Sequence, residues 1–271
     1  AVPQKGKIRY REGFAIVTVG WLLVSLYGCL PYLLSGVCTN FPDAFFESMS
    51  GFTTTGASIF ADAEALPRGI LFWRSLTQWL GGMGIIVFLG ALLSYLVMSV
   101  LEAAILCFLG MPLFDSLCHT FGTMATGGFN IKNASIGYYD QVSIHWVITI
   151  FMFLAGANFA LYFLALYRRS LKVFWKNEEF RFYLVVVVSA IVLVVLNNIS
   201  HFNGIEETIR ASAFQVVSII TTTGYTNTDF SMWPYMSQAV LLIILFIGGC
   251  SGSTSGSIKA GRILILLKQA V

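Results

Sequence analysis

Long runs without charged residues most constrain how this chain folds. A membrane-spanning helix needs about 20 predominantly apolar residues. The runs of about this length or longer are residues 13–34, 75–94, 142–167, 182–200 and 232–258. Residues 95–110 form a shorter apolar run that contains Glu102. Because only 11% of the residues are charged, against about 25% in soluble domains, a soluble enzyme, a nucleic-acid-binding module and a disordered chain are excluded. We expect an all-α membrane protein with six spans in contact with membrane lipid.

The basic residues set the expected orientation of these spans. They cluster at residues 5–11, 168–181 and 259–268. The positive-inside rule places all three clusters in the cytoplasm, so that the N-terminus is cytoplasmic and the first helix runs outward. Most acidic residues then fall at the outer ends, where a negative potential attracts cations.

Three segments between the spans repeat one pattern. Each has a short apolar stretch, then small hydroxylated residues, then Thr-Gly, and they occupy residues 44–57, 115–128 and 212–225. Aligned by eye, Thr55, Thr126 and Thr223 take the same place before Gly56, Gly127 and Gly224. A single Thr-Gly favours close helix packing by small residues. Three copies, each between two spans, favour instead a helix–pore loop–helix unit.

The repeated unit predicts a cation site. Irregular backbone at membrane depth is tolerated only where it is buried in protein or lines a watery cavity. Glycine permits backbone angles that turn carbonyl groups toward one axis, and each short helix points its partial negative C-terminus to the same place. Such converging carbonyls form a dehydrated cation site. The expected ion-binding residues are Thr54, Thr55, Gly56, Ala125, Thr126, Gly127, Thr222, Thr223 and Gly224.

A glycine- and serine-rich run interrupts the last long apolar stretch. Residues 248–257 read GGCSGSTSGS, and both residue types weaken a helix. We expect residues 248–257 to be unwound at mid-membrane, on the inner side of the cation site, with the helix resuming at Ile258. The alternative is a glycine-rich hinge or a close helix contact.

These motifs resemble those of the Trk/Ktr potassium-uptake family, and most closely those of its TrkH membrane subunits. The pore-loop motifs are FTTTGA (52–57), TMATGGF (123–129) and ITTTGY (220–225), and the further motifs are WLGGMG (79–84) and GGCSGST (248–254). The resemblance implies the potassium-selective, pore-forming subunit of an uptake system in the bacterial inner membrane, not an enzyme. Potassium would be the transported ion, held at Thr55, Thr126 and Thr223, with no covalent cofactor.

The same resemblance implies partners and a gate. Family members form homodimers that a cytoplasmic, nucleotide-binding regulatory subunit controls. The intramembrane gating loop would comprise Gly248, Gly249, Cys250, Ser251, Gly252, Ser253, Thr254, Ser255 and Gly256.

The chain departs from the four-repeat pattern of the family. We assign a first repeat to residues 13–94, a second to 95–169 and a third, with a broken return helix, to 181–271, and a fourth is absent from this chain. The first two Thr-Gly segments lie closer in sequence than the second and third, and the helix before the second is short. We therefore expect residues to be missing near Ser94–Tyr95.

The sequence leaves two other functions possible, and it leaves two roles possible for Asp43 and Glu47. A secondary cation symporter also uses broken helices, but in inverted repeats, whereas these repeats run in the same direction. Gly249-Cys250-Ser251-Gly252 matches a serine-protease motif, which needs a histidine base near Ser251. Asp43 and Glu47 either attract cations at the outer mouth or act as helix caps and partners of arginines such as Arg68 or Arg74.

Overall fold

Helices make up the regular structure of the residues that the computed structural model describes, 9–86 and 89–270. The helices are α1 Tyr10–Gly28, α2 Leu30–Leu34, α3 Phe41–Phe52, α4 Arg68–Ile85, α5 Leu89–Phe108, α6 Leu113–Met124, α7 Val142–Ala155, α8 Phe159–Arg168, α9 Lys172–Lys176, α10 Glu178–Asn198, α11 Ile205–Ile220, α12 Tyr235–Ile244 and α13 Ala260–Ala270. Two short 3₁₀ helices, η1 Ser135–Tyr138 and η2 Phe230–Met232, complete them. Lys5 and Lys7 of the first basic cluster, part of the predicted span 75–94, and Val271 lie outside the described residues.

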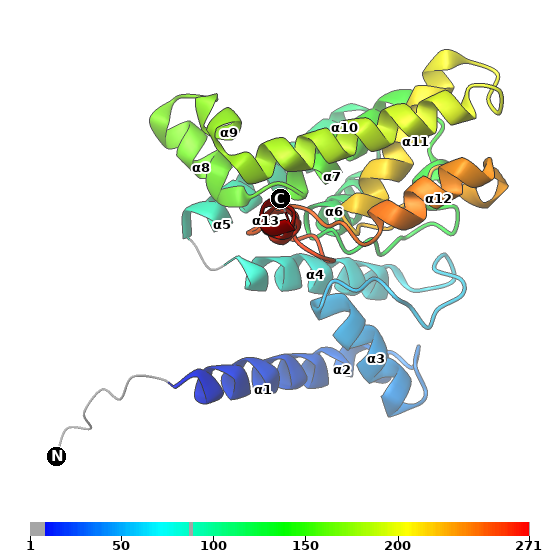
Figure 1. Cartoon of the computed structure of the whole chain (residues 1–271). Coiled ribbons are helices and arrows are strands. Elements are labelled where there is room, and N and C mark those ends of the chain that lie inside the picture. The colour runs from blue at the N-terminus through cyan, green and yellow to red at the C-terminus, as the bar shows by residue number, and fades with distance from the viewer. Residues whose placement is uncertain (1–8, 87–88, 271) are drawn as a thin grey trace.

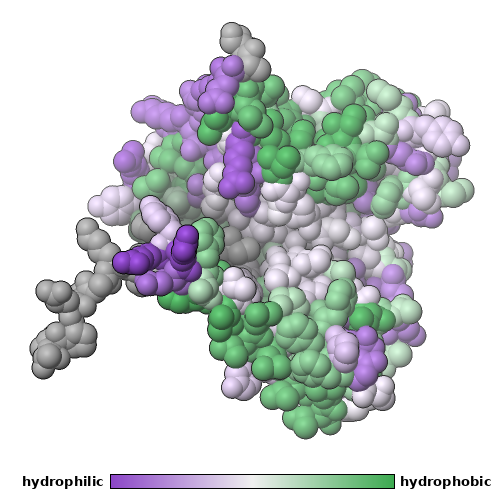
Figure 2. Space-filling model, turned by 60° about the horizontal axis from the view of Figure 1, so that its bottom comes forward, coloured by the Kyte–Doolittle hydropathy of each residue, from purple (hydrophilic) through white to green (hydrophobic). Residues whose placement is uncertain are grey.

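Three described helices are long and apolar enough to cross a membrane: α1 with α2, α5 and α10. The pair α7 and α8 adds a fourth candidate if its two helices, bent by 91°, are one broken span. This is fewer than the six spans expected. Within the described residues, α12 is a shorter apolar helix of 10 residues, and α4 carries Arg68 and Arg74. Large hydrophobic side chains are exposed along α1, α5 and α10, and Figure 2 shows hydrophobic surface over much of one face of the molecule.

Two of the predicted spans are interrupted. The run 75–94 is divided between α4, which ends at Ile85, and α5, which begins at Leu89, so that Ser94 and Tyr95 lie inside a continuous helix. The run 142–167 breaks after Ala155, where the Asn158 side chain accepts a hydrogen bond from the Ala160 amide and caps α8. Neither interruption could be predicted from composition, because the apolar residues continue across both.

The three predicted short helices are α3, α6 and α11, and each packs between two other helices. Helix α3 packs against α1 and α4, α6 against α4 and α5, and α11 against α7 and α10. Figure 1 shows α1, α4 and α10 with roughly parallel axes, α4 running opposite to the other two, and the N-terminal end of α1 on the same side as α8 and α9. Helices α6 and α11 therefore end among buried residues, whereas Thr53 and Thr55, which follow α3, are exposed.

Candidate functional site: three filter loops and a glycine-serine segment

The three half-helices end in one common backbone turn. It continues into the three loops that the sequence predicts to form an ion filter, named here the first (residues 53–57), second (125–129) and third (221–225) filter loop. One residue after each helix cap, a threonine adopts a left-handed conformation, with φ 55° at Thr54, 51° at Thr126 and 58° at Thr222. Two residues later a glycine does the same, with φ 77° at Gly56, 73° at Gly128 and 81° at Gly224. A β-carbon is disfavoured in this conformation, so the glycines adopt it without strain, whereas the three threonines adopt it at a cost.

This turn corrects the alignment of the second loop by one residue. The amides of Thr55, Gly127 and Thr223 donate to the carbonyls of Ser50, Gly122 and Ser218, respectively. Gly127 is therefore the equivalent of Thr55 and Thr223, and Thr126 is the equivalent of Thr54 and Thr222. Ala125 becomes a helix cap, like Thr53 and Thr221. The adjacent glycines 127 and 128 allowed both registers, and only the backbone distinguishes them.

The filter loops contact one another in chain order. A β-carbon added at Gly56 would overlap the carbonyl oxygen of Gly127, and one added at Gly128 would overlap that of Thr223. A β-carbon at Gly224 would meet no described atom within 4 Å. Each of the first two filter glycines thus lies against the backbone of the next loop, whereas the third faces open space.

A buried ion pair supports the first loop. Glu47 of α3 accepts a 2.7 Å hydrogen bond from Arg74 Nε of α4, and both side chains are almost completely buried. The same carboxylate accepts from Ser58 Oγ and the Ile59 amide, each at 3.0 Å, just after the first loop. Glu47 is therefore the partner of Arg74, while Asp43 lies in the exposed first turn of α3, where its amide donates to Asn40.

Arg74 also reaches the second loop. Its Nη1 donates to the Asn130 carbonyl at 3.2 Å, and its guanidinium lies 4.3 Å from the centre of the Phe129 ring. Gln78, one turn further along α4, accepts from the Phe129 amide through Oε1 at 3.0 Å. Helix α4 therefore positions the segments that follow the first two loops.

The corrected register places His119 and Gln215 at the level of Glu47 in the other half-helices. His119 Nε2 lies 3.2 Å from Tyr139 Oη, which donates to Asp115 at 2.8 Å. Gln215 is also buried, and its Oε1 has no hydrogen-bond partner among the described residues. All three half-helices thus carry a buried polar side chain at this position: a carboxylate, an imidazole and an amide.

A hydroxyl group ties two of the loops to their own half-helices. Ser50 Oγ donates to the Ala57 carbonyl at 2.5 Å, and Ser218 Oγ donates to the Tyr225 carbonyl at 2.7 Å. The second half-helix has Gly122 at this position, and the Tyr225 hydroxyl occupies the space of the missing side chain. That hydroxyl donates to the His119 carbonyl at 3.2 Å. Sequence reasoning missed this exchange, although the serine that precedes the first and third Thr-Gly at the same spacing, and is absent from the second, was a usable signal.

Two further acidic residues occupy contrasting sites. At the exposed side, Asn133 Nδ2 donates to Asp62 at 2.8 Å and lowers the pKa of that carboxyl, so that Asp62 stays ionised to lower pH. Glu102 is completely buried in α5, and neither of its carboxylate oxygens has a hydrogen-bond partner in the described part of the chain.

The glycine-serine segment, residues 248–257, is non-helical, as the sequence predicts. Helix α12 already ends at Ile244, and α13 begins at Ala260. The two ends of the segment are joined, since the Gly248 amide donates to the Ile258 carbonyl at 2.8 Å and the Ala260 amide to the Gly249 carbonyl at 3.0 Å. The segment is therefore a closed loop with a hydrogen-bonded neck.

The tip of this loop lies against two filter loops. Thr254 Oγ1 donates to the Met124 carbonyl at 2.9 Å, and the Gly256 amide donates to Thr222 Oγ1 at 2.7 Å. Lys259 Nζ donates back to the carbonyls of Ser253 and Ser255. The segment thus contacts the ends of the second and third half-helices directly.

Neighbouring helices hold the other side of the loop. The Cys250 amide donates to the Gly156 carbonyl at 2.8 Å, at the break between α7 and α8. Glu179 of α10 accepts from the Ser251 amide at 2.6 Å and from the Gly261 amide at 2.9 Å. In the part of the chain that the structure describes, Ser251 has no hydrogen bond to His119, His145 or His201, so the protease alternative lacks its base.

Comparisons with known proteins identify the family and agree with the fold. The family model described as "TrkH: Cation transport protein" matches residues 3–103 and 91–271. The chain is 38% identical to the Trk system potassium uptake protein TrkH of Salmonella typhimurium and 39% identical to that of Escherichia coli K12, in each case over 98% of this chain and 63% of the relative. The crystal structure of the potassium transporter TrkH from Vibrio parahaemolyticus superposes with a TM-score of 0.91 at 36% identity, over 98% of this chain and 62% of that one.

The extent of these matches is informative in itself. The chain spans about 63% of the length of the curated relatives. The alignments run over 306 positions, more than the 271 residues of this chain. The two family-model matches also overlap at residues 91–103, within α5. With the family model covering nearly the whole sequence and relatives above 30% identity, the chain belongs to the TrkH family of cation transport proteins.

Proposed function

We propose that this chain forms the potassium-selective part of the pore in a Trk-type uptake system. The observation that carries the proposal is the direct contact of three filter loops with one backbone geometry. The carbonyls of residues 54–56, 126–128 and 222–224 coordinate the dehydrated ion. Rings of backbone carbonyls are the usual means of binding potassium. The relatives that this chain resembles at 38–39% identity are named potassium uptake proteins.

The experiment is a matched pair of glycine substitutions. In Gly56→Ser, the new side chain meets the Gly127 carbonyl inside the filter. Gly36→Ser introduces the same side chain at a similar positive φ, 73°, with no atom within 4 Å. We expect Gly56→Ser to lower the ratio of potassium to sodium uptake and Gly36→Ser to leave it unchanged. Equal ratios in both variants would place selectivity elsewhere in the protein.

We infer further that the glycine-serine segment is the gate. Its tip contacts the end of α6 and Thr222 of the third filter loop through single hydrogen bonds. Deleting residues 253–256 removes the tip and leaves the neck, and should raise potassium uptake and weaken its regulation. Ser251→Ala is the control, because only the backbone of Ser251 is hydrogen-bonded. Normal regulated uptake after the deletion would reduce the segment to a hinge.

The complete assembly is also part of the proposal. A fourth repeat closes the ring of filter loops beside Gly224, whose added β-carbon would meet no described atom within 4 Å. Further residues near α5, which this chain does not contain, complete the second repeat. The protein is a multi-pass homodimer in the bacterial inner membrane with a cytoplasmic N-terminus, and a cytoplasmic nucleotide-binding subunit regulates it. Labelling a cysteine introduced at Arg9 with a membrane-impermeant reagent tests the orientation, since reaction in intact cells would contradict it.

A further inference from the structure

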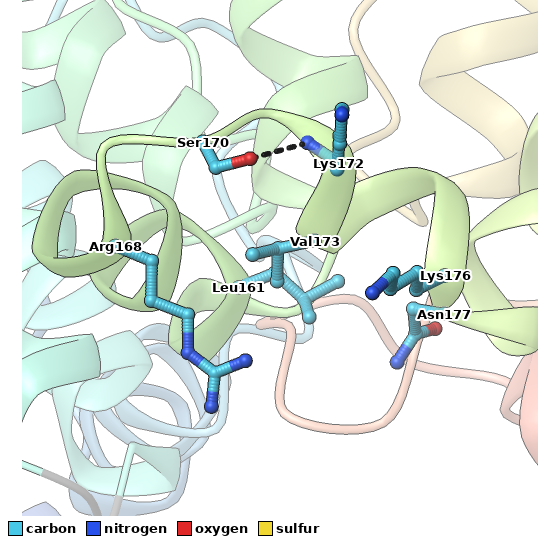
Figure 3. Close-up of a pocket in the computed structure, with 7 residues that line it drawn as sticks. All are labelled: Leu161, Arg168, Ser170, Lys172, Val173, Lys176 and Asn177. Atoms are coloured by element: carbon cyan, nitrogen blue, oxygen red, sulfur yellow. Dashed lines mark hydrogen bonds between the residues drawn. The ribbon is translucent and has the colours of Figure 1, made fainter.

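A basic pocket lies between α8 and α10, far from the filter loops along the chain. It is a cavity of about 380 Å³ with Leu161 and Val173 at its centre and Arg168, Lys172, Lys176 and Asn177 around it. Figure 3 shows Arg168 and Lys176 on opposite sides of the two apolar residues. The pocket thus combines an apolar floor with three positively charged side chains.

The positive charge of the pocket is not neutralised by the protein. Within residues 9–86 and 89–270, the side chains of Arg168, Lys172 and Lys176 form no ion pair. The two carboxylates that follow the pocket in sequence are engaged elsewhere: Glu178 pairs with Lys268, and Glu179 accepts from the backbone beside the glycine-serine segment. Unpaired cations around a concave surface concentrate a positive potential that attracts an anion.

Two features of the rim allow hydrogen bonding to such an anion. Asn177 uses Oδ1 to cap α10 by accepting from the Phe180 amide, which leaves its Nδ2 donor without a partner in the described chain. Ser170 Oγ accepts from the Lys172 amide at 3.4 Å, so its own proton remains available. Together with the three cations, these groups are donors, as a phosphate group requires.

Exposed apolar side chains neighbour the pocket in the sequence. Tyr167, Leu171 and Trp175 are 78%, 75% and 63% exposed, and all three lie beside the basic residues in sequence. Exposed aromatic and aliphatic side chains among lysines and arginines are typical of a segment at the membrane interface. The pocket also lies next to the N-terminal end of α10, one of the membrane-spanning candidates.

We propose that this pocket binds the phosphate headgroup of an anionic membrane phospholipid. Arg168, Lys172 and Lys176 surround the phosphate, while Leu171 and Trp175 contact the acyl chains. Free phosphate shares the charge but would make no use of the exposed apolar rim, which is why the lipid is the better occupant. Basic pockets at helix ends are a known mode of headgroup recognition.

Fluorescence quenching tests the proposal on the whole protein. The protein is placed in phosphatidylcholine vesicles that contain a small fraction of phosphatidylglycerol with brominated acyl chains, which quench nearby tryptophan. Trp175→Phe identifies the share of the signal that comes from Trp175. We expect brominated phosphatidylglycerol to quench Trp175 more strongly than brominated phosphatidylcholine at the same fraction.

Charge substitutions show whether the pocket causes that preference. Each basic residue near anionic lipid typically strengthens binding about fivefold, so that Lys172→Gln with Lys176→Gln should weaken it by at least about tenfold. Lys172→Arg with Lys176→Arg should retain it. The matched control is Arg169→Gln with Arg181→Gln, which removes two exposed charges outside the pocket lining and should have little effect.

Several outcomes would overturn the proposal. Equal quenching by the two lipids would show that no headgroup is selected. Equal losses in the pocket and control variants would reduce the effect to general surface charge. Displacement of the lipid by millimolar inorganic phosphate would show that the site takes the free anion. Loss of a bound cytoplasmic protein, with lipid preference unchanged, would assign the pocket to a protein partner.

Discussion

At the level where the first half-helix carries Glu47, the second carries His119, and the two loops are held in different ways. The chain after the first loop is fixed by a buried carboxylate that is paired with Arg74. The second loop is held at its last residue by a neutral group, with Gln78 accepting from the Phe129 amide, and Arg74 adds only a hydrogen bond to the carbonyl of the next residue, Asn130. Both loops nevertheless have the same left-handed threonine and glycine.

The two loops show that one backbone conformation can be held by different kinds of hydrogen-bond partner. Buried backbone groups need a hydrogen-bond partner, but the partner's identity is free. A charged partner and a neutral one therefore produce the same turn, but they differ in what their removal costs. Loss of one partner from a buried ion pair leaves an uncompensated charge, whereas loss of a neutral acceptor leaves one unsatisfied amide.

The largest effect is expected from breaking the ion pair. Arg74→Ala leaves Glu47 buried without its cation and should lower the free energy of unfolding by about 3–5 kcal/mol. Thermal unfolding in detergent measures the loss. The double variant Glu47→Gln, Arg74→Ala should recover part of it, because no buried charge remains. A double variant no more stable than Arg74→Ala would show that packing of Arg74 on Phe129, not charge, is what matters.

A smaller effect is expected at the second loop. Gln78→Leu removes the acceptor of the buried Phe129 amide and should cost about 1–3 kcal/mol. Gln78→Glu retains a carboxylate oxygen at the same place, but it places a charge in a buried site and should therefore also destabilise. Gln78→Met adds no charge and no acceptor, so it should resemble Gln78→Leu. If Gln78→Leu proved as damaging as Arg74→Ala, the contrast between charged and neutral support would fail.

The third prediction compares the two serine hydroxyls. Ser218→Ala leaves the carbonyl of the fully buried Tyr225 without its donor, whereas Ser50→Ala affects the carbonyl of Ala57, which is exposed and accessible to water. We expect Ser50→Ala, which removes a solvated hydrogen bond, to lower the free energy of unfolding by about 0.5 kcal/mol. Ser218→Ala should lower it by about 1–2 kcal/mol more than that. The two unfolding temperatures give the comparison directly, and the reverse order would contradict it.

The smallest effect is expected at the exposed contact between the segments that follow the two loops. Asn133→Ala removes the hydrogen bond to Asp62, and an exposed pair contributes little to stability. The same variant should raise the pKa of Asp62 toward its ordinary value, because that hydrogen bond lowers it. Titration of Asp62 by NMR checks the shift, and an unchanged pKa would remove Asn133 as its cause.

Composition and repetition predicted the half-helices well. The stretches before each Thr-Gly became α3, α6 and α11, and the glycine-serine segment is non-helical. These features depend on local residue types and were therefore visible in the sequence. The register of the second loop was not, because Gly127 and Gly128 fit the same pattern and only φ distinguishes them.

Long-range pairings were beyond the sequence for a different reason. Arg68 and Arg74 were equal candidates as partners of Glu47, and only the packing of α3 on α4 selects Arg74. The break at Gly156 was missed because the apolar residues continue on both sides of it. Its significance appears only in three dimensions, where the Gly156 carbonyl meets the Cys250 amide.

The neck of the glycine-serine segment has a consequence for how this protein can change during evolution. Hydrogen bonds at Gly248–Ile258 and Gly249–Ala260 already hold the ends of the loop together. The entropy of closing a loop grows only with the logarithm of its length, so residues added at the tip cost little closure entropy where the hydrogen bonds of Thr254 and Gly256 are kept. Helices α12 and α13 keep their positions while this happens. Relatives can therefore alter the tip without adjusting the surfaces that face the lipid.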